Sequence, residues 1–304
     1  MNMRKVPGTG LSVSEICLGT MTFGTPVEEK EAIRLIHYAL EKGINHIDTA
    51  NMYEGYSRVA GSGGGVAEEI IGKALAGRRS DAIVATKVGM KVGLAAEDEF
   101  TSPAAIRKQL DISLSRLATD YIDIYYLHKP DPATPLEEIV TEIHHAIRAG
   151  KIRHYAVSNY DAAALEKLLH AADACGAPRP VMCQPPMSLL KQDALQDLLP
   201  LCSKEDIAVA PYQILQGGLL SGKYKRGMPL PAGSRKEEKP DWLWQLDDAL
   251  FTKLEAIEAN ASLKGLTMTQ FAIRWILEQP AVVSAIVGVK NERQIDEAVL
   301  ACER

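Results

Sequence analysis

Short apolar runs alternate with amphipathic stretches along the whole chain. Residues 16–19 form an apolar run of strand length, and in residues 28–43 Ala32, Ile36 and Ala39 recur at helical spacing. Repeated strand–helix order is typical of parallel strands joined by crossover helices. The pattern predicts strands over residues 16–19, 44–48, 82–87, 122–128, 152–159, 181–184, 207–212 and 283–288.

Residues at the expected helix ends support this alternation. Ser102 and Pro103 suit the N-cap and first turn of a helix, and Thr134 with Glu137 fits a capping box. Helices are predicted over residues 28–43, 66–77, 102–118, 134–150, 161–176, 193–205, 247–261 and 291–303, with an additional one over 267–280.

Eight strand–helix units in about 300 residues fit one closed (β/α)8 barrel. We therefore predict an α/β fold with a single domain, residues 1–304. A doubly wound sheet is the rival, but GTMTFGTP after the first strand lacks the GxGxxG fingerprint. Two segments interrupt the alternation. The Gly-rich residues 61–66 are interpreted as a flexible loop, and the charged residues 234–245, within the connection 222–246, as an exposed lid or binding loop.

Composition narrows the class of protein. A net charge of −5, with 46% hydrophobic and 24% charged residues, argues against nucleic acid or an anionic membrane as the main partner. Five scattered cysteines without CxxC or metal-finger spacing indicate reduced thiols, and no metal site is predicted. The sequence shows no signal peptide and no apolar run of membrane-spanning length, so a cytoplasmic protein is expected.

Most of the predicted strands end in, or are followed by, a residue with polar or catalytic potential. In a (β/α)8 barrel the carboxyl ends of the strands meet at one mouth, where the chemistry gathers. A lone lysine or histidine in such a place is more simply structural, but a polar residue at successive strand ends favours a site. The residues concerned are Asp48, Lys87, His128, Ser158, Asn159, Gln184, Tyr212 and Gly288.

An acid, a phenol, an ammonium and an imidazole together suit the reduction of a carbonyl group. Tyr53 lies five residues after Asp48, and a nearby Lys87 ammonium is expected to lower the pKa of the phenol. Asp48 would then be the counter-ion of the buried lysine, and His128 would orient the carbonyl oxygen. The groups that suit the carboxamide and the ring face of a nicotinamide belong to Ser158, Asn159, Gln184 and Tyr212.

At these residues the sequence resembles the aldo-keto reductase family. The resemblance runs from RKVPGTGLSVSEICLGTMTFG to IVGVKNERQIDEAV, and DTANMY, TKVG, YYLHKPD and VSN match family motifs in order. It implies a TIM barrel with an N-terminal β-hairpin cap and long βα loops. It implies catalytic roles for Asp48, Tyr53, Lys87 and His128, hereafter the tetrad. It implies that NADP(H) is bound by Thr20, Met21, Asp48, Ser158, Asn159, Gln184, Tyr212, Leu215, Gly217, Lys223, Gly288, Lys290, Gln294 and Glu297.

The resemblance implies NADPH-dependent reduction of an aldehyde or ketone, with the proton supplied by Tyr53. Lys290, in the segment expected to hold the adenosine 2′-phosphate, fits NADP rather than NAD because a phosphate needs a cationic partner. One alternative is an NADP(H)-binding regulatory subunit on the same fold, similar to potassium-channel β subunits. Another is an alcohol or sugar dehydrogenase. The expected partner is a small-molecule carbonyl substrate.

Overall fold

The computed structural model describes residues 1–59 and 61–303, so Ala60 and Arg304 of the expected domain lie outside the described residues. A two-stranded antiparallel hairpin precedes an eight-stranded sheet in which every neighbouring pair of strands is parallel. The hairpin consists of β1 (Met3–Lys5) and β2 (Ser12–Ser14). The sheet runs in the order β10 (Ala285–Gly288), β3 (Ile16–Gly19), β4 (His46–Asp48), β5 (Ile83–Val88), β6 (Ile122–Leu127), β7 (Ile152–Ser158), β8 (Met182–Gln184) and β9 (Ala208–Val209).

Backbone hydrogen bonds close the sheet between its first and last strands. The amide of Val209 donates to the carbonyl of Ala281 at 2.8 Å, and the amide of Val283 donates back to Val209 at 2.9 Å. The amide of Ile286 reaches the carbonyl of Pro211 at 3.0 Å. These bonds join β9 to the residues around β10, which confirms the predicted closed barrel.

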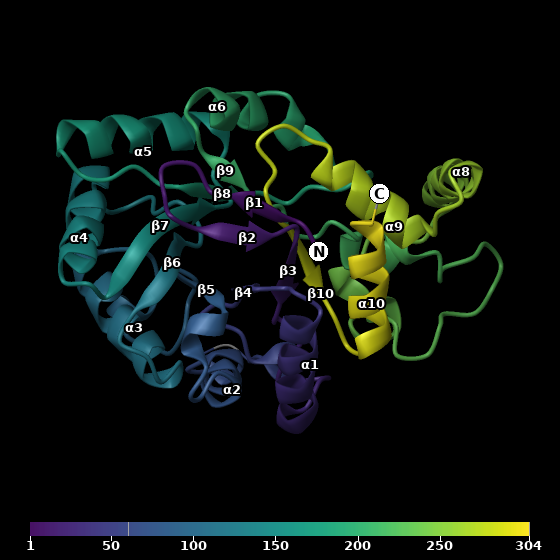
Figure 1. Cartoon of the computed structure of the whole chain (residues 1–304), viewed down its shortest axis with the longest axis horizontal. Coiled ribbons are helices and arrows are strands. Elements are labelled where there is room, and N and C mark those ends of the chain that lie inside the picture. Colours follow the sequence, from purple (N-terminus) through teal and green to yellow (C-terminus); the bar gives the residue numbers. More distant parts are fainter. Residues whose placement is uncertain (60, 304) are drawn as a thin grey trace.

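The helices follow the strands as the sequence predicted, and Figure 1 shows α1 to α6 arranged around the outside of the curved sheet. The segment predicted as one helix over 193–205 is instead a 3₁₀ turn, Asp193–Leu195, followed by a short helix. The extra helix before the last strand is confirmed. The helices are α1 (Glu29–Glu41), α2 (Val66–Ala74), α3 (Pro103–Arg116), α4 (Leu136–Arg148), α5 (Ala162–Ala174), α6 (Leu198–Lys204), α7 (Arg235–Glu238), α8 (Asp248–Leu263), α9 (Met268–Leu277) and α10 (Glu292–Ala301).

One of the two predicted helix starts is wrong. Ser102 caps α3, because its hydroxyl accepts a hydrogen bond from the amide of Ala105 at 3.2 Å. The predicted capping box at Thr134 and Glu137 does not form, and α4 begins after Pro135 without a side-chain cap. The amide of Thr134 instead donates to the carboxylate of Asp131 at 3.1 Å, so the preceding turn is fixed by a residue upstream of the motif.

The core has an inner and an outer layer. Buried side chains inside the barrel, including Ile124 and Tyr126, pack with Val6 and Val13 of the hairpin. A larger layer fills the space between the sheet and the surrounding helices. Figure 1 shows the hairpin lying across the barrel. Because the hairpin covers the amino-terminal ends of the strands, the opposite mouth is left for chemistry.

Two long connections border that mouth. The first joins β4 to α2 and contains the 3₁₀ turn Gly55–Ser57. The second, residues 222–246, contains α7 and the 3₁₀ turn Pro240–Trp242, so the stretch interpreted as an exposed lid or binding loop has local helical structure. No helix within residues 1–59 and 61–303 is long and apolar enough to cross a membrane.

Candidate active site

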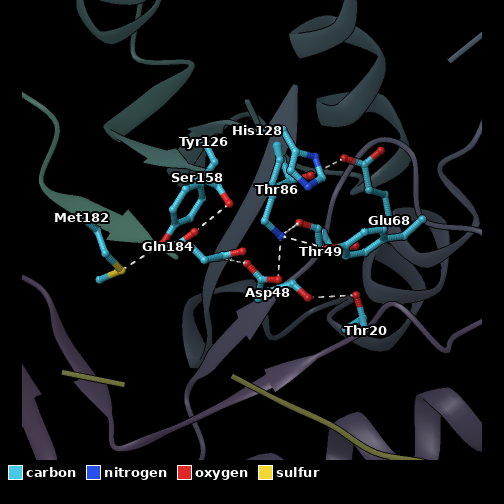
Figure 2. A network of polar contacts seen from close by, with 12 residues as sticks. Thr20, Asp48, Thr49, Glu68, Thr86, Tyr126, His128, Ser158, Met182 and Gln184 are labelled. Carbon is cyan, nitrogen blue, oxygen red and sulfur yellow. Dashed lines mark hydrogen bonds and ion pairs between the residues drawn. The ribbon is translucent and has the colours of Figure 1, made fainter. Parts of the chain in front are cut away.

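The barrel brings the predicted strand-end residues to one mouth. Asp48 ends β4, Ser158 ends β7 and Gln184 ends β8, while Lys87 lies one residue before the end of β5. His128 directly follows β6. Because all of these strands are parallel, the side chains converge, and Figure 2 shows Asp48, Gln184, Thr49 and His128 as neighbours.

The Lys87 side chain is completely buried and lies at the centre of this group. Its Nζ donates to Asp48 Oδ2 at 2.6 Å and to the carbonyl oxygen of Thr49 at 2.7 Å. The same nitrogen lies 3.4 Å from the hydroxyl of Tyr53. The ammonium therefore connects the acid at the strand end with the phenol of the following loop.

Asp48 is itself held by its neighbours. Gln184 Nε2 donates to Asp48 Oδ1 at 2.8 Å, which leaves Oδ2 for the lysine. The hydroxyl of Thr20 donates to the backbone carbonyl of Asp48 at 2.9 Å. Ser158 in turn fixes Gln184, because its hydroxyl donates to the backbone carbonyl of Gln184 at 2.9 Å. The carboxylate thus has one fixed orientation towards Lys87.

The expected direction of the Tyr53 pKa is wrong. Burial raises the pKa of the phenol above its usual value of 10.0, and the opposing effect of Lys87 does not overcome it. Burial disfavours the charge of Lys87, but its contacts with Asp48 and Tyr53 outweigh burial, so the pKa of Lys87 is also raised. At neutral pH the pair is therefore a neutral phenol beside an ammonium.

His128 lies against Tyr53 as a neutral imidazole. The two rings are nearly perpendicular, at 79°, with centroids 6.2 Å apart. Burial, together with Lys87 and Lys129, holds the pKa of His128 well below its usual 6.5. Its backbone is fixed on both sides, by the carbonyl of Val88 and by the side-chain amide of Asn159 at 2.8 Å each.

Two of the residues expected near a nicotinamide contact each other. Asn159 has a left-handed backbone with φ of 61°, and its Oδ1 accepts a hydrogen bond from the Tyr212 hydroxyl at 2.7 Å. Its Nδ2 lies 3.2 Å from the hydroxyl of Ser158. The structure therefore places both amide atoms of Asn159 at the mouth, beside the half-buried ring of Tyr212.

The expected phosphate-binding residues form a second, cationic group away from the tetrad. Gly217 and Gly218 have positive φ of 65° and 97°, and a Cβ on Gly218 would come within 2.9 Å of Lys223 Nζ. Burial lowers the pKa of Lys223, and the positive charges of Lys290 and Arg235 lower it further. Lys223, Lys290 and Arg235 therefore lie close enough for their positive charges to interact.

The remaining expected cofactor residues lie on or near β3 and β10. Met21 is half-buried beyond β3, Leu215 is half-buried in the core, and Gly288 ends β10 with its backbone exposed. Gln294 Oε1 accepts from the amide of Lys290 at 2.6 Å. Glu297 accepts from the hydroxyl of Thr267, the N-cap of α9, at 2.9 Å.

Sequence reasoning missed a cluster of aromatic and cationic side chains at the edge of this group. The ring of Tyr56 has Arg235 at 5.3 Å, Lys239 at 5.9 Å and Lys290 at 5.3 Å from its centroid. Trp242 packs against the same ring edge-on, with centroids 5.4 Å apart and its own side chain half exposed. Segment 222–246 thus packs against the loop after Tyr53, and the sequence signals for this contact were the charge pattern of RKEEK and the tryptophan at position 242.

The Gly-rich residues 61–66 lead into α2 as a loop, as predicted, and part of this loop is closely packed. A Cβ on Gly64 would lie 2.3 Å from the carbonyl oxygen of Asn51, just before Tyr53, and a Cβ on Gly65 would collide with the guanidinium of Arg116. Arg116 donates to the carbonyl of Gly63 at 3.0 Å and lies 3.4 Å from the buried carboxylate of Glu68. The glycines allow this loop to pack directly against the turn that carries Tyr53.

A closed parallel barrel with this group of residues at its carboxyl mouth places the protein in the class of TIM-barrel oxidoreductases. The chain matches the model of the aldo/keto reductase family over residues 15–304, and it belongs to that family.

Known proteins resemble the chain over nearly its whole length. It is 33% identical to an uncharacterized oxidoreductase, YrpG, of Bacillus subtilis, covering 97% of this chain and 89% of the relative. It is 31% identical to a probable voltage-gated potassium channel subunit beta of Arabidopsis thaliana, covering 100% of this chain and 92% of the relative. Among solved structures, a glycerol dehydrogenase of Gluconobacter oxydans is similar, with a TM-score of 0.82, 30% identity, and coverage of 99% of this chain and 90% of that one.

Proposed function

We propose that the protein is an NADPH-dependent reductase that converts an aldehyde or ketone to the alcohol, with Tyr53 as proton donor. One observation carries the proposal: Lys87 Nζ contacts both Asp48 Oδ2, at 2.6 Å, and the Tyr53 hydroxyl, at 3.4 Å, at the carboxyl mouth of the barrel. An ammonium in that position stabilises the negative charge that develops on the phenol as its proton leaves.

The residues present fit the nucleotide that this reaction needs. Lys223, Arg235 and Lys290 offer concentrated positive charge, and Gly218 leaves room for the backbone and Lys223 to approach a pyrophosphate. Asn159 and Gln184 offer amide groups for a carboxamide, next to the flat face of Tyr212. When bound, the reduced nicotinamide supplies a hydride to the carbonyl carbon.

The side chains of the tetrad divide the remaining work. The Tyr53 hydroxyl donates its proton to the carbonyl oxygen, and its raised pKa keeps it protonated at neutral pH. Lys87 is held in place by Asp48 and by the carbonyl of Thr49. His128 is neutral and donates a hydrogen bond to the substrate oxygen without adding charge.

The comparisons supply two further candidate functions. Similarity to a glycerol dehydrogenase favours a polyol or another alcohol as substrate, with the same residues working in the oxidising direction. In that direction Tyr53 must be a phenolate that accepts a proton. Burial disfavours the charge of that phenolate. Similarity to a probable channel β subunit favours a nucleotide-binding regulatory role.

Tyr53→Phe tests the proposal directly. We expect NADPH-dependent reduction to fall by at least about 100-fold, because the variant lacks only the proton donor. The dissociation constant for NADPH should stay within about twofold, since the ring remains. Turnover is followed by NADPH absorbance across a panel of aldehydes and ketones, and binding by calorimetry.

Tyr121→Phe is the matched control, because that ring lies between Arg79 and Arg153 and precedes β6, at the opposite end of that strand from His128. It should retain full activity. Undiminished reduction by Tyr53→Phe would rule out the assigned role. Tight NADPH binding by the wild type without turnover on any carbonyl would favour the regulatory function, and turnover with alcohols and NADP⁺ alone would favour the dehydrogenase.

A further inference from the structure

Segment 222–246 carries a carboxylate into the cationic group. Helix α7 is a single turn that begins after Ser234, whose hydroxyl accepts from the amide of Glu237. The turn is anchored at its start by Arg235, which lies over the Tyr56 ring at 5.3 Å. Its last residue is Glu238, which this arrangement directs back towards β10 and the segment after it.

Glu238 binds Lys290, the lysine that is expected to set cofactor choice. Its Oε2 accepts a hydrogen bond from Lys290 Nζ, and the pair is about one-quarter exposed on each side. The same Nζ donates to the carbonyl of Gly233 at 2.9 Å. Two oxygens from segment 222–246 therefore contact the ammonium that is expected to face a 2′-phosphate.

The neighbouring charges show that Glu238 is in a place suited to an anion. Its negative charge acts on Lys223, opposing the lowering of that lysine's pKa by Lys290 and Arg235. Glu237, the adjacent residue on the same helix, has a different contact: its carboxylate accepts from the amide of Gly233 at 2.6 Å. The contact with Lys290 therefore depends on one position of the helix and not on the acidity of the segment as a whole.

A phosphate and a carboxylate cannot both take Lys290 as their close partner without repelling each other. We propose that Glu238 is an internal ligand of Lys290 that competes with the 2′-phosphate of NADP(H) and thereby weakens the preference for NADPH over NADH. This inference rests on the proposed nucleotide-binding function. NADPH displaces Glu238 from Lys290, whereas NADH, which lacks the 2′-phosphate, binds with the Glu238–Lys290 pair intact.

Glu238→Gln separates the competing charge from the shape of the side chain. We expect the dissociation constant for NADPH to fall about three- to tenfold, because the phosphate no longer has to displace an ion pair at Lys290. The constant for NADH should stay within about twofold. Both are measured on the full-length protein by calorimetry, without substrate, and the fragments 2′,5′-ADP and 5′-ADP should show the same contrast.

Two further variants make the result specific. Glu237→Gln removes the same charge one residue away and should leave the NADPH to NADH ratio unchanged. In a Lys290→Ala background, Glu238→Gln should no longer improve NADPH binding, because the residue with which it competes is gone.

The inference is overturned if Glu238→Gln weakens NADPH binding, changes both nucleotides equally, or is matched by Glu237→Gln. It is equally overturned if the gain persists in Lys290→Ala. Wild-type protein that binds neither nucleotide would overturn the proposed function as well, so the two failures are distinguishable.

Discussion

Lys87 shows how a buried charge is stabilised by an ion pair and a hydrogen bond. A fully buried ammonium is costly unless it is paired and hydrogen-bonded, and here the carboxylate of Asp48 and the carbonyl of Thr49 provide both. The third direction of the ammonium points at the Tyr53 hydroxyl. The arrangement that allows the lysine to be buried is thus also the one that directs it at the proposed proton donor.

Lys87→Met should therefore cost both stability and activity. Loss of the partner leaves Asp48 buried and unpaired, and we expect the free energy of unfolding to fall by about 3–5 kcal/mol. Urea denaturation at pH 7 measures the loss. The double variant Asp48→Asn/Lys87→Met, which has no buried charge at this place, should recover most of the stability and remain inactive. Equal instability of the single and double variants would contradict the assignment of the loss to an unpaired carboxylate.

At the scale of elements, the connection between β4 and α2 is the most informative. It carries Tyr53 and Tyr56, and its glycines pack against the turn that precedes Tyr53. Arg116, at the end of α3, ties the same loop to α2 through Glu68. Neighbouring barrel helices thus contribute to the position of the phenol, and the amide of Ala67, at the start of α2, donates to the carbonyl of Tyr53 at 3.0 Å.

Gly64→Ala tests this packing. Gly64 has φ of +65°, and an added Cβ would lie 2.3 Å from the carbonyl oxygen of Asn51. An alanine would therefore strain the backbone and also clash with that oxygen. We expect a loss of at least about 2 kcal/mol in the free energy of unfolding and a lower kcat for reduction, because the turn before Tyr53 must move.

Gly63→Ala is the matched control, because its Cβ would meet nothing closer than a guanidinium nitrogen of Arg116 at 3.9 Å. Its stability should stay within about 0.5 kcal/mol of wild type and its kcat should be unchanged. If the two alanine variants behave alike, the loop does not position Tyr53.

At the scale of the whole molecule, closing the barrel buries a second neutral histidine besides His128. The hydroxyl of Ser284 donates to the carbonyl of Ser14 at 2.7 Å, so it accepts the 3.2 Å bond from His46 Nδ1. Burial, reinforced by Lys87, lowers the pKa of His46 to about 3. In the unfolded chain this histidine takes up a proton near its ordinary pKa of 6.5.

This difference makes stability depend on pH with a definite sign. Between about pH 3 and 6.5 the unfolded state binds the proton and the folded state does not, so stability rises with pH and is lost on acidification. His46 alone should cost about 2 kcal/mol between pH 7 and pH 5. His46→Asn keeps a hydrogen-bond donor for Ser284. Its free energy of unfolding, measured by urea titration, should fall by about 2 kcal/mol less than that of the wild type over the same pH range. Identical pH dependence of the two proteins would contradict a neutral buried His46.

The fold was largely predictable because it depends on local patterns. The alternation of apolar runs and helical periodicity is a property of neighbouring residues, and it anticipated the strands and most of the helices. The capping box at Thr134 does not form because the amide of Thr134 is bonded to Asp131 in the preceding turn. The spacing of the motif does not reveal this bond. The break in the helix predicted over 193–205 precedes Pro200, whose ring would clash with the carbonyl of Gln196 in a continuous helix.

For the site, the sequence by itself determined which chemical groups stand at the strand ends and the five-residue spacing of Asp48 and Tyr53. Only the tertiary structure decided that burial outweighs Lys87 in setting the pKa of Tyr53, because desolvation depends on everything packed around the phenol. It alone placed Glu238 on Lys290, 52 residues away in sequence. Residue types and local periodicity are fixed by the chain, whereas distances between remote charges and their exclusion from water exist only once the barrel has closed.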